Sequence, residues 1–121
     1  RGEGSRRAVA IESTFGGVAE TDLVGEPAGS CGGRRALVRS GFETPLRAVY
    51  APELAYFECL HELKFIVDLM HEAGISGMRT LISETAKWGD LTVGPRIIDR
   101  SVERRMALAL RRIQSGKFAK E

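Results

Sequence analysis

The apolar and polar positions of this chain follow a helical period from residue 21 onward. The longest regular stretch begins at Ala51-Pro52-Glu53, where Pro52 suits the first helical position because an N–H there would have no partner inside the helix. The stretch runs to about Glu72 and then meets Gly74, a residue type that commonly ends helices. The sequence therefore predicts one long helix in the middle of the chain.

Shorter periodic stretches surround this helix on both sides. They predict helices over residues 22–40, 42–50, 76–87 and 101–114. Gly89-Asp90 and Gly94-Pro95 predict a loop between the last two, because glycine and proline both disfavour helix interiors. One apolar run at residues 8–11 is compatible with a lone strand, but no strand alternation and no internal repeat follow it. The fold is therefore predicted to be all-α.

Size and charge narrow the class of protein. A chain of 121 residues suffices for one domain with a single core. Its 18 basic and 16 acidic residues leave a net charge of +2, which argues against a dedicated nucleic-acid binder. No apolar run approaches the roughly 20 residues that span a bilayer, and no apolar stretch of a secretory signal follows the charged start. We therefore expect a cytoplasmic protein that binds neither membranes nor nucleic acids.

Two glutamates, Glu58 and Glu62, lie one helical turn apart in the longest helix. At about 100° per residue they fall outside its polar stripe. That stripe gathers Glu53, Phe57, His61, Lys64, Asp68 and His71. Apolar neighbours flank the two glutamates instead, and carboxylates one turn apart repel each other in such a setting. A cation between them would remove both penalties, whereas the competing interpretation is that they face water or an arginine from another helix.

A second acidic pair, Asp22 and Glu26, has the same four-residue spacing. Four glycines lie at helical spacing along one face: Gly25, Gly29, Gly32 and Gly33. Each costs a helix roughly 0.5–1 kcal/mol relative to alanine, so four on one face indicate that another backbone approaches closely there. Pro27 favours the competing interpretation of a loop, because a proline inside a helix removes a hydrogen bond and clashes with the preceding turn. Either the helix is kinked at Pro27, or its regular part starts near that residue.

The two acidic pairs together offer oxygen ligands only, the set that hard cations such as Mg²⁺ prefer. Four carboxylates on two helices could hold two ions, and a two-metal site can clamp a substrate with neighbouring oxygens and polarise its carbonyl. A di-iron site is disfavoured, because Glu58-x-x-His61 has no second copy on another helix. The arginines between residues 100 and 112 are interpreted as the solvent face of an amphipathic helix rather than as phosphate ligands.

A series of short motifs carries more specific information. They follow one another in order along nearly the whole chain, at residues 21–26, 31–33, 41–44, 50–53, 55–64, 66–69, 89–91, 94–96 and 113–116. The most specific is Ala55-Tyr-Phe-Glu-Cys-Leu-His-Glu-Leu-Lys64. These motifs resemble the C-terminal knotted domain of ketol-acid reductoisomerase in its short, class I form. The resemblance implies an all-α knotted domain of the 6-phosphogluconate-dehydrogenase C-terminal-like type over residues 15–121, incomplete at its C-terminus. Residues 1–14 would be the end of, or the linker from, an N-terminal Rossmann domain that is absent.

The resemblance also implies a reaction. That family converts 2-acetolactate, or 2-aceto-2-hydroxybutanoate, into 2,3-dihydroxy acids on the way to valine and isoleucine. Two Mg²⁺ ions promote an alkyl migration, and NADPH then reduces the product. By resemblance Asp22 would bridge both ions and Glu26 would bind one of them. Glu58 and Glu62 would bind the other, with Glu62 also catalytic, and Ser83 would bind substrate.

The family further implies a homodimer or higher oligomer whose subunits share their sites. Glu58, Glu62 and Ser83 of one subunit would then face Asp22 and Glu26 of the other subunit. Two local departures stand out, because Pro27 replaces a glutamine and Val49 a glycine of the family pattern. The NADPH site would lie on the absent domain, so we expect the chain alone to be inactive as a reductase. The alternative is a non-catalytic helical dimerisation module that keeps the fold without the chemistry.

Overall fold

The computed structural model describes residues 11–120, and every regular element in that range is helical. The predicted all-α class is therefore confirmed. The apolar run at residues 8–11 lies outside the described residues except for Ile11, which belongs to no regular element.

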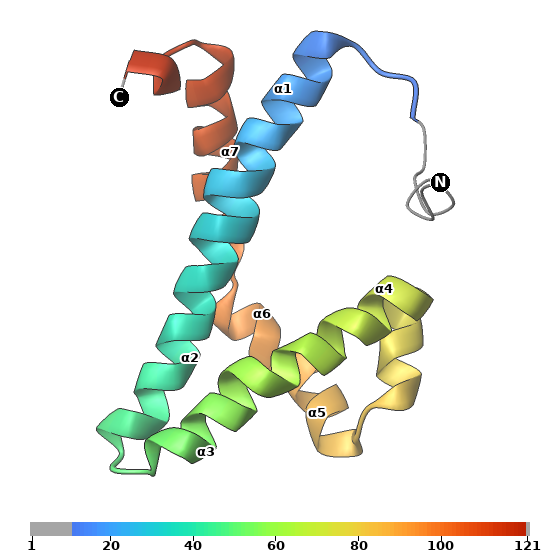
Figure 1. The fold of residues 1–121 in the computed structure, drawn as a ribbon, viewed down its shortest axis with the longest axis vertical. Coiled ribbons are helices and arrows are strands. Elements are labelled where there is room, and N and C mark those ends of the chain that lie inside the picture. The colour runs from blue at the N-terminus through green and yellow to red at the C-terminus, as the bar shows by residue number, and fades with distance from the viewer. Residues whose placement is uncertain (1–10, 121) are drawn as a thin grey trace, which may run out of the picture.

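The first arm of the fold is one uninterrupted helical run. It consists of α1 (Phe15–Val24), the π-helix η2 (Gly25–Arg34) and α2 (Arg35–Arg47), and Figure 1 shows it as a single rod. Thr14 caps its start, because the Thr14 hydroxyl accepts a hydrogen bond from the N–H of Gly17 at 3.1 Å. The prediction of two separate helices over residues 22–40 and 42–50 is wrong, because helical winding starts at Phe15 and continues through position 41.

A tight turn joins the first arm to the next helix. The N–H of Tyr50 donates to the carbonyl of Pro45 at 3.1 Å. Within the turn Val49 has a φ of 67°, the sole positive φ of a non-glycine residue between positions 11 and 120. A β-branched side chain is strained in that region of φ and ψ.

The second arm is the predicted long helix. It consists of α3 (Pro52–Tyr56), the π-helix η3 (Phe57–His61) and α4 (Glu62–Leu81). Pro52 occupies the first turn, as predicted. Gly74, with a φ of 69° and a ψ of 174°, kinks α4 at the predicted position, since glycine alone adopts that conformation without strain. Helical winding then resumes and runs to Leu81.

The rest of the chain is also helical. It contains α5 (Glu84–Trp88), the π-helix η4 (Gly89–Val93), α6 (Gly94–Ile97), α7 (Arg100–Gln114) and the 3₁₀ turn η5 (Phe118–Lys120). The predicted loop around Gly89-Asp90 and Gly94-Pro95 is wrong, because winding continues through both glycines. The predicted last helix is confirmed in α7, where the Asp99 carboxylate accepts from the N–H of Ser101 at 2.8 Å and caps the start.

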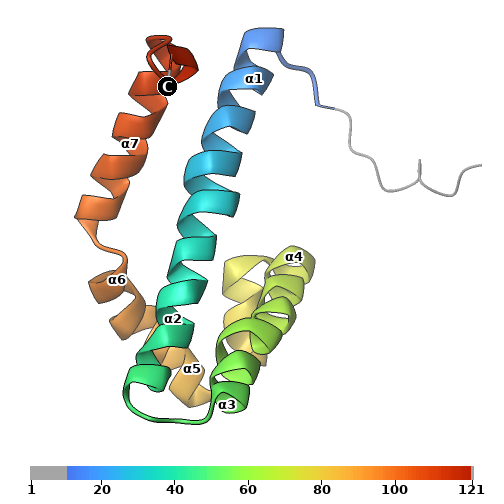
Figure 2. The ribbon, with the colours of Figure 1, turned by 60° about the vertical axis from the view of Figure 1, so that its left-hand side comes forward.

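The arms meet at one end and diverge at the other, and α7 lies along the first arm (Figures 1 and 2). The α7 helix runs antiparallel to α1 and η2. Its Gln114 amide donates to Glu20 at 3.3 Å, and its Met106 methyl group faces Gly33. At the junction of the arms, α2 packs against α3 and η3.

The described residues bury very little. Ala55 and Met78 are the fully buried apolar residues, whereas 23 large apolar side chains of this range are exposed. The total accessible surface is 10335 Å², compared with about 6,400 Å² for a folded monomer of 13.2 kDa. The fold therefore leaves apolar surface uncovered that a stable protein normally buries. No helix in the described range is long and apolar enough to cross a membrane.

Candidate metal and substrate site

The first acidic pair lies where the first arm changes its winding. Asp22 is in the last turn of α1 and Glu26 is in the first turn of η2. Both side chains are exposed, and neither carboxylate has a hydrogen-bond or ion-pair partner among residues 11–120. The N–H of Gly25, between them, donates to the carbonyls of Thr21 and Asp22, so the helix is continuous through the pair. The two carboxylates are therefore available to an external ligand.

Two of the glycines that follow this pair, Gly32 and Gly33, lie close to the backbone of their own helix. A Cβ at Gly32 would lie 1.7 Å from the carbonyl oxygen of Pro27, and a Cβ at Gly33 would lie 2.3 Å from that of Ala28. Within residues 11–120 the nearest atoms to both positions belong to their own helix, and Gly33 also faces the Met106 methyl group of α7. The predicted approach of another backbone to this face stays a prediction. The predicted kink or late start at Pro27 is wrong. The helix passes through Pro27 by widening into a π-helix.

The second acidic pair spans another π-helix. Glu58 is in η3 and Glu62 is the first residue of α4. Both are exposed, and neither carboxylate has a partner within the described part of the chain. They line a groove of about 440 Å³ together with Phe57, His61, Lys64, Phe65 and Asp68.

This groove corrects one prediction. Glu58 and Glu62 were expected to face away from the polar stripe, yet they share the groove with its His61, Lys64 and Asp68. A π-turn holds more residues than an α-turn, so the steps of 100° on which the expectation rested do not apply across residues 57–61. Lys64 is bonded to Asp68 rather than to either glutamate.

Ser83 lies at the break between α4 and α5. Its hydroxyl accepts a hydrogen bond from the N–H of Ala86 at 3.2 Å and caps α5. An ion pair from Arg79 of α4 to Asp90 of η4 spans this break, with both side chains about one-third exposed. It joins different helical segments, whereas the ion pairs of Arg39 and Arg47 with Glu43, of Lys64 with Asp68 and of Lys87 with Glu84 link residues three or four apart along one run. Sequence reasoning missed it, because eleven residues and a chain reversal separate its members.

The two acidic pairs are not brought together within one chain. Among residues 11–120, no group of three or more His, Cys, Asp or Glu side chains could hold a metal ion. The donor chemistry of each pair fits Mg²⁺, since both offer exposed carboxylate oxygens alone. Each pair supplies two ligands, so a complete site needs groups from another surface.

Comparison with known proteins decides the family. The family model described as "Ketol-acid reductoisomerase, C-terminal domain" matches residues 17–121. The chain belongs to the ketol-acid reductoisomerase family. A solved structure of an NADH-preferring ketol-acid reductoisomerase from an uncultured archaean is similar, with a TM-score of 0.88 and 46% sequence identity. The match covers 91% of this chain and 33% of that one, so the chain spans about a third of the length of this reductoisomerase. The resemblance inferred from the motifs is confirmed.

Membership in the ketol-acid reductoisomerase family gives the acidic pairs a chemical context. It supports the reaction class and the branched-chain amino-acid pathway for the family to which the chain belongs. The roles of Asp22, Glu26, Glu58, Glu62 and Ser83 in this chain stay predictions.

Proposed function

We propose that this chain provides the metal- and substrate-binding domain of a ketol-acid reductoisomerase. Such an enzyme would convert 2-acetolactate or 2-aceto-2-hydroxybutanoate into 2,3-dihydroxy acids. The observation that carries the proposal is the pair of exposed, unpartnered acidic clusters on separate helical arms. Oxygen-only ligands in this number suit two Mg²⁺ ions.

The proposed site is shared between two copies of the chain. The first pair of one subunit would face the second pair and Ser83 of the other. The uncovered apolar surface of the arms supports this arrangement, because a partner copy would bury it. The knotted topology of the family's domain belongs to the same proposal.

Each residue has a distinct task in this proposal. Asp22 would bridge both ions, Glu26 would bind one, and Glu58 would bind the other. Glu62 would bind that second ion and also hold a proton close to the reacting oxygens, as its place in the groove beside His61 allows. When bound, the ions would polarise the substrate carbonyl and neighbouring oxygens. Ser83 would donate its hydroxyl hydrogen to the substrate, because the hydroxyl oxygen already accepts from Ala86.

The nicotinamide cofactor would be bound by a nucleotide-binding domain outside residues 11–120. NADPH is the cofactor that we expected by resemblance, whereas the similar archaeal reductoisomerase is NADH-preferring. The choice between the two would therefore rest with that other domain. Purified alone, this chain should show no nicotinamide-dependent consumption of 2-acetolactate.

Magnesium titration tests the metal site directly. Calorimetry of the chain should show saturable binding in the micromolar-to-millimolar range, and Glu58→Gln should abolish it. Glu53→Gln is the matched control, because Glu53 is also an exposed, unpartnered glutamate of the second arm but does not line the groove. The alternative, a non-catalytic dimerisation module, predicts self-association without saturable magnesium binding.

Complementation tests the shared site. Asp22→Asn and Glu58→Gln chains should each fail to bind Mg²⁺. A mixture of the two that is unfolded and refolded together should recover about a quarter of the wild-type sites, because half of the dimers would be mixed and each mixed dimer would hold one intact site. No recovery in refolded mixtures that do form mixed dimers would show that the site is not shared.

A further inference from the structure

Pro27 creates a structural problem for Glu26 in particular. Proline disfavours helical φ and ψ at the residue before it, and its ring clashes with the carbonyl four residues back. The residue before Pro27 is Glu26, and the carbonyl in question belongs to Leu23, one residue after Asp22. An ordinary α-helix would therefore be disturbed at the first acidic pair itself. In the structure Glu26 nevertheless stays within a continuous helical run.

The change from α- to π-winding compensates for the backbone N–H that Pro27 lacks. Up to Gly25 the helix follows the α pattern, in which the N–H of Gly25 reaches the carbonyl of Thr21. In the π pattern each carbonyl is matched to the N–H five residues on. The α pattern would match the Leu23 carbonyl to Pro27, which has no N–H, whereas a five-residue match would call on Ala28 instead. The π-helix that contains Pro27 is therefore the winding that tolerates its missing N–H.

The π-winding in turn requires glycine five residues after Pro27 and Ala28. At position 32 a Cβ would lie 1.7 Å from the Pro27 oxygen and 2.9 Å from its carbonyl carbon, and at position 33 it would lie 2.3 Å from the Ala28 oxygen. These neighbours are backbone atoms and cannot move without rewinding the helix. Gly29, in the same π-helix, differs from both, because a Cβ there would meet the Val24 oxygen at an ordinary 3.7 Å.

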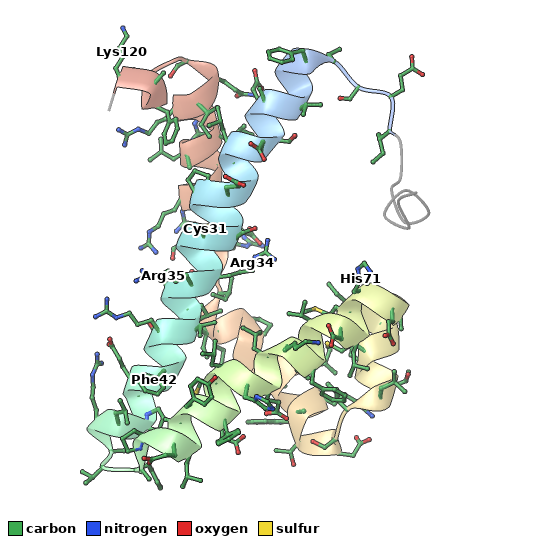
Figure 3. The ribbon with its side chains drawn as sticks, viewed as in Figure 1. Cys31, Arg34, Arg35, Phe42, His71 and Lys120 are labelled. Atoms are coloured by element: carbon green, nitrogen blue, oxygen red, sulfur yellow. The ribbon has the colours of Figure 1, made fainter. Side chains whose placement is uncertain are left out.

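The Arg34 side chain supports the same segment from its end. Its guanidinium donates to the Ser30 hydroxyl at 2.7 Å and to the Gly29 carbonyl at 3.4 Å. Figure 3 shows Arg34 on the first arm beside Cys31 and Arg35. The bonds cross one turn of the π-helix and bind its last residue back onto its middle.

We propose that Gly32 and Gly33 are positioning residues for the first acidic pair. Because they lack a Cβ, they permit the π-winding that accommodates Pro27. This winding keeps Glu26 helical and one turn after Asp22. The inference rests on the proposed function, in which these two carboxylates bind metal. It adds the residues that set their geometry in a chain where a proline follows one of the ligands.

Thermal unfolding of the full 121-residue chain tests the coupling between glycine and proline. Gly32→Ala should lower the midpoint by about 5–10 °C, whereas Gly29→Ala should leave it unchanged or raise it slightly, because alanine favours helix and nothing obstructs its Cβ. In a Pro27→Gln chain the helix can rewind as an ordinary α-helix, so adding Gly32→Ala should cost less than half as much. Gly33→Ala should behave like Gly32→Ala. Equal midpoints for Gly32→Ala and Gly29→Ala, or no relief by Pro27→Gln, would overturn the proposal.

A histidine pair reports the geometry of positions 22 and 26 without magnesium. Two histidines four residues apart on a helix chelate a transition metal, so an Asp22→His/Glu26→His chain should bind Ni²⁺ at least about tenfold more tightly than Asp22→His alone. In the Asp22→His/Glu26→His chain, Gly32→Ala should remove that tenfold advantage, and adding Pro27→Gln as well should restore it. Gly29→Ala in the same chain should leave the Ni²⁺ affinity unchanged. If the role of Gly32 were purely structural, Gly32→Ala would lower the unfolding midpoint but leave the Ni²⁺ affinity of the folded chain unaltered. That result would reject the positioning role. Failure of the unaltered chain to bind Mg²⁺ would instead reject the proposed function, and both tests above would still stand.

Discussion

The two arms both change from α- to π-winding beside an acidic residue, but they do so with different residues. The first arm has a π-helix of ten residues that contains a proline and four glycines, and no residue of α1, η2 or α2 is buried. The second arm has a π-helix of five residues with neither glycine nor proline, next to the buried Ala55. In the first arm local backbone requirements set the winding, whereas in the second arm packing against α2 accompanies it. The same helical spacing of two carboxylates therefore has separate causes in the two arms.

The largest expected effect concerns packing in the second arm. Ala55 is 2% exposed, so Ala55→Asp would bury an unpaired carboxylate and should destabilise the chain by at least about 3 kcal/mol. Ala36→Asp, at an exposed position of the first arm, should cost about 0.5 kcal/mol. Urea unfolding at one protein concentration measures both. Similar losses would show that the second arm depends on packing no more than the first.

The turn between the arms offers a change in the opposite direction. Val49 is 91% exposed and has a positive φ, so Val49→Gly removes backbone strain without losing contacts and should stabilise the chain by about 1 kcal/mol, after the entropy that glycine adds to the unfolded state. Val18→Gly, in ordinary α1 winding, should instead destabilise by about 0.5 kcal/mol. Thermal unfolding distinguishes the two signs. A loss of stability in Val49→Gly would mean that the turn is not strained.

How far the sequence predicted this fold depends on which rules apply locally. Pro52 and Gly74 marked real boundaries, because a proline in a first turn and a glycine with positive φ act through their own backbone. Gly41, Gly89 and Gly94 were expected to interrupt helices and do not. Gly41 lies beside Cys59, whose Sγ would be at an ordinary 3.6 Å from a Cβ at position 41, a tertiary contact that no local rule includes. The acidic pairs were recognisable from spacing and residue type. The directions in which their side chains leave the helix axis depend on π-turns, which a period of 3.6 residues does not describe.

An effect of similar size is expected at the break after the second arm, where Ser83 lies. Asp90→Asn breaks the ion pair with Arg79 and should cost about 1 kcal/mol, because these partly exposed charges are only partly screened. Asp68→Asn breaks an exposed pair within α4 and should cost about 0.3–0.5 kcal/mol. Hydrogen exchange adds a local measurement, since Asp90→Asn should speed exchange of the Ala86 and Lys87 amides, which bond to Ser83. Unchanged exchange at these amides would show that the ion pair does not hold the turn.

The smallest effect is a pH dependence in the first arm. Arg39 donates to the Glu43 carboxylate at 2.6 Å and holds the pKa of Glu43 below its ordinary value of 4.5, with Arg47 contributing at 2.8 Å. A pKa that is lower in the folded chain adds stability above the unfolded value and loses it as the pH falls through the folded value. The unfolding midpoint should therefore drop slightly as the pH falls below about 4.5. The drop should be smaller in Glu43→Gln than in Glu72→Gln, which removes an exposed carboxylate without a partner in residues 11–120.

The antiparallel contact between α1 and α7 has a consequence for synthesis in the cell. Glu20 and Gln114 are bonded across 94 positions of the chain. Contacts of such separation close slowly. On the ribosome, helix α1 emerges before its neighbour and stays without it until residues 100–114 have been made. Throughout that interval the apolar side chains of the first arm are available to chaperones and to other nascent copies of the same chain.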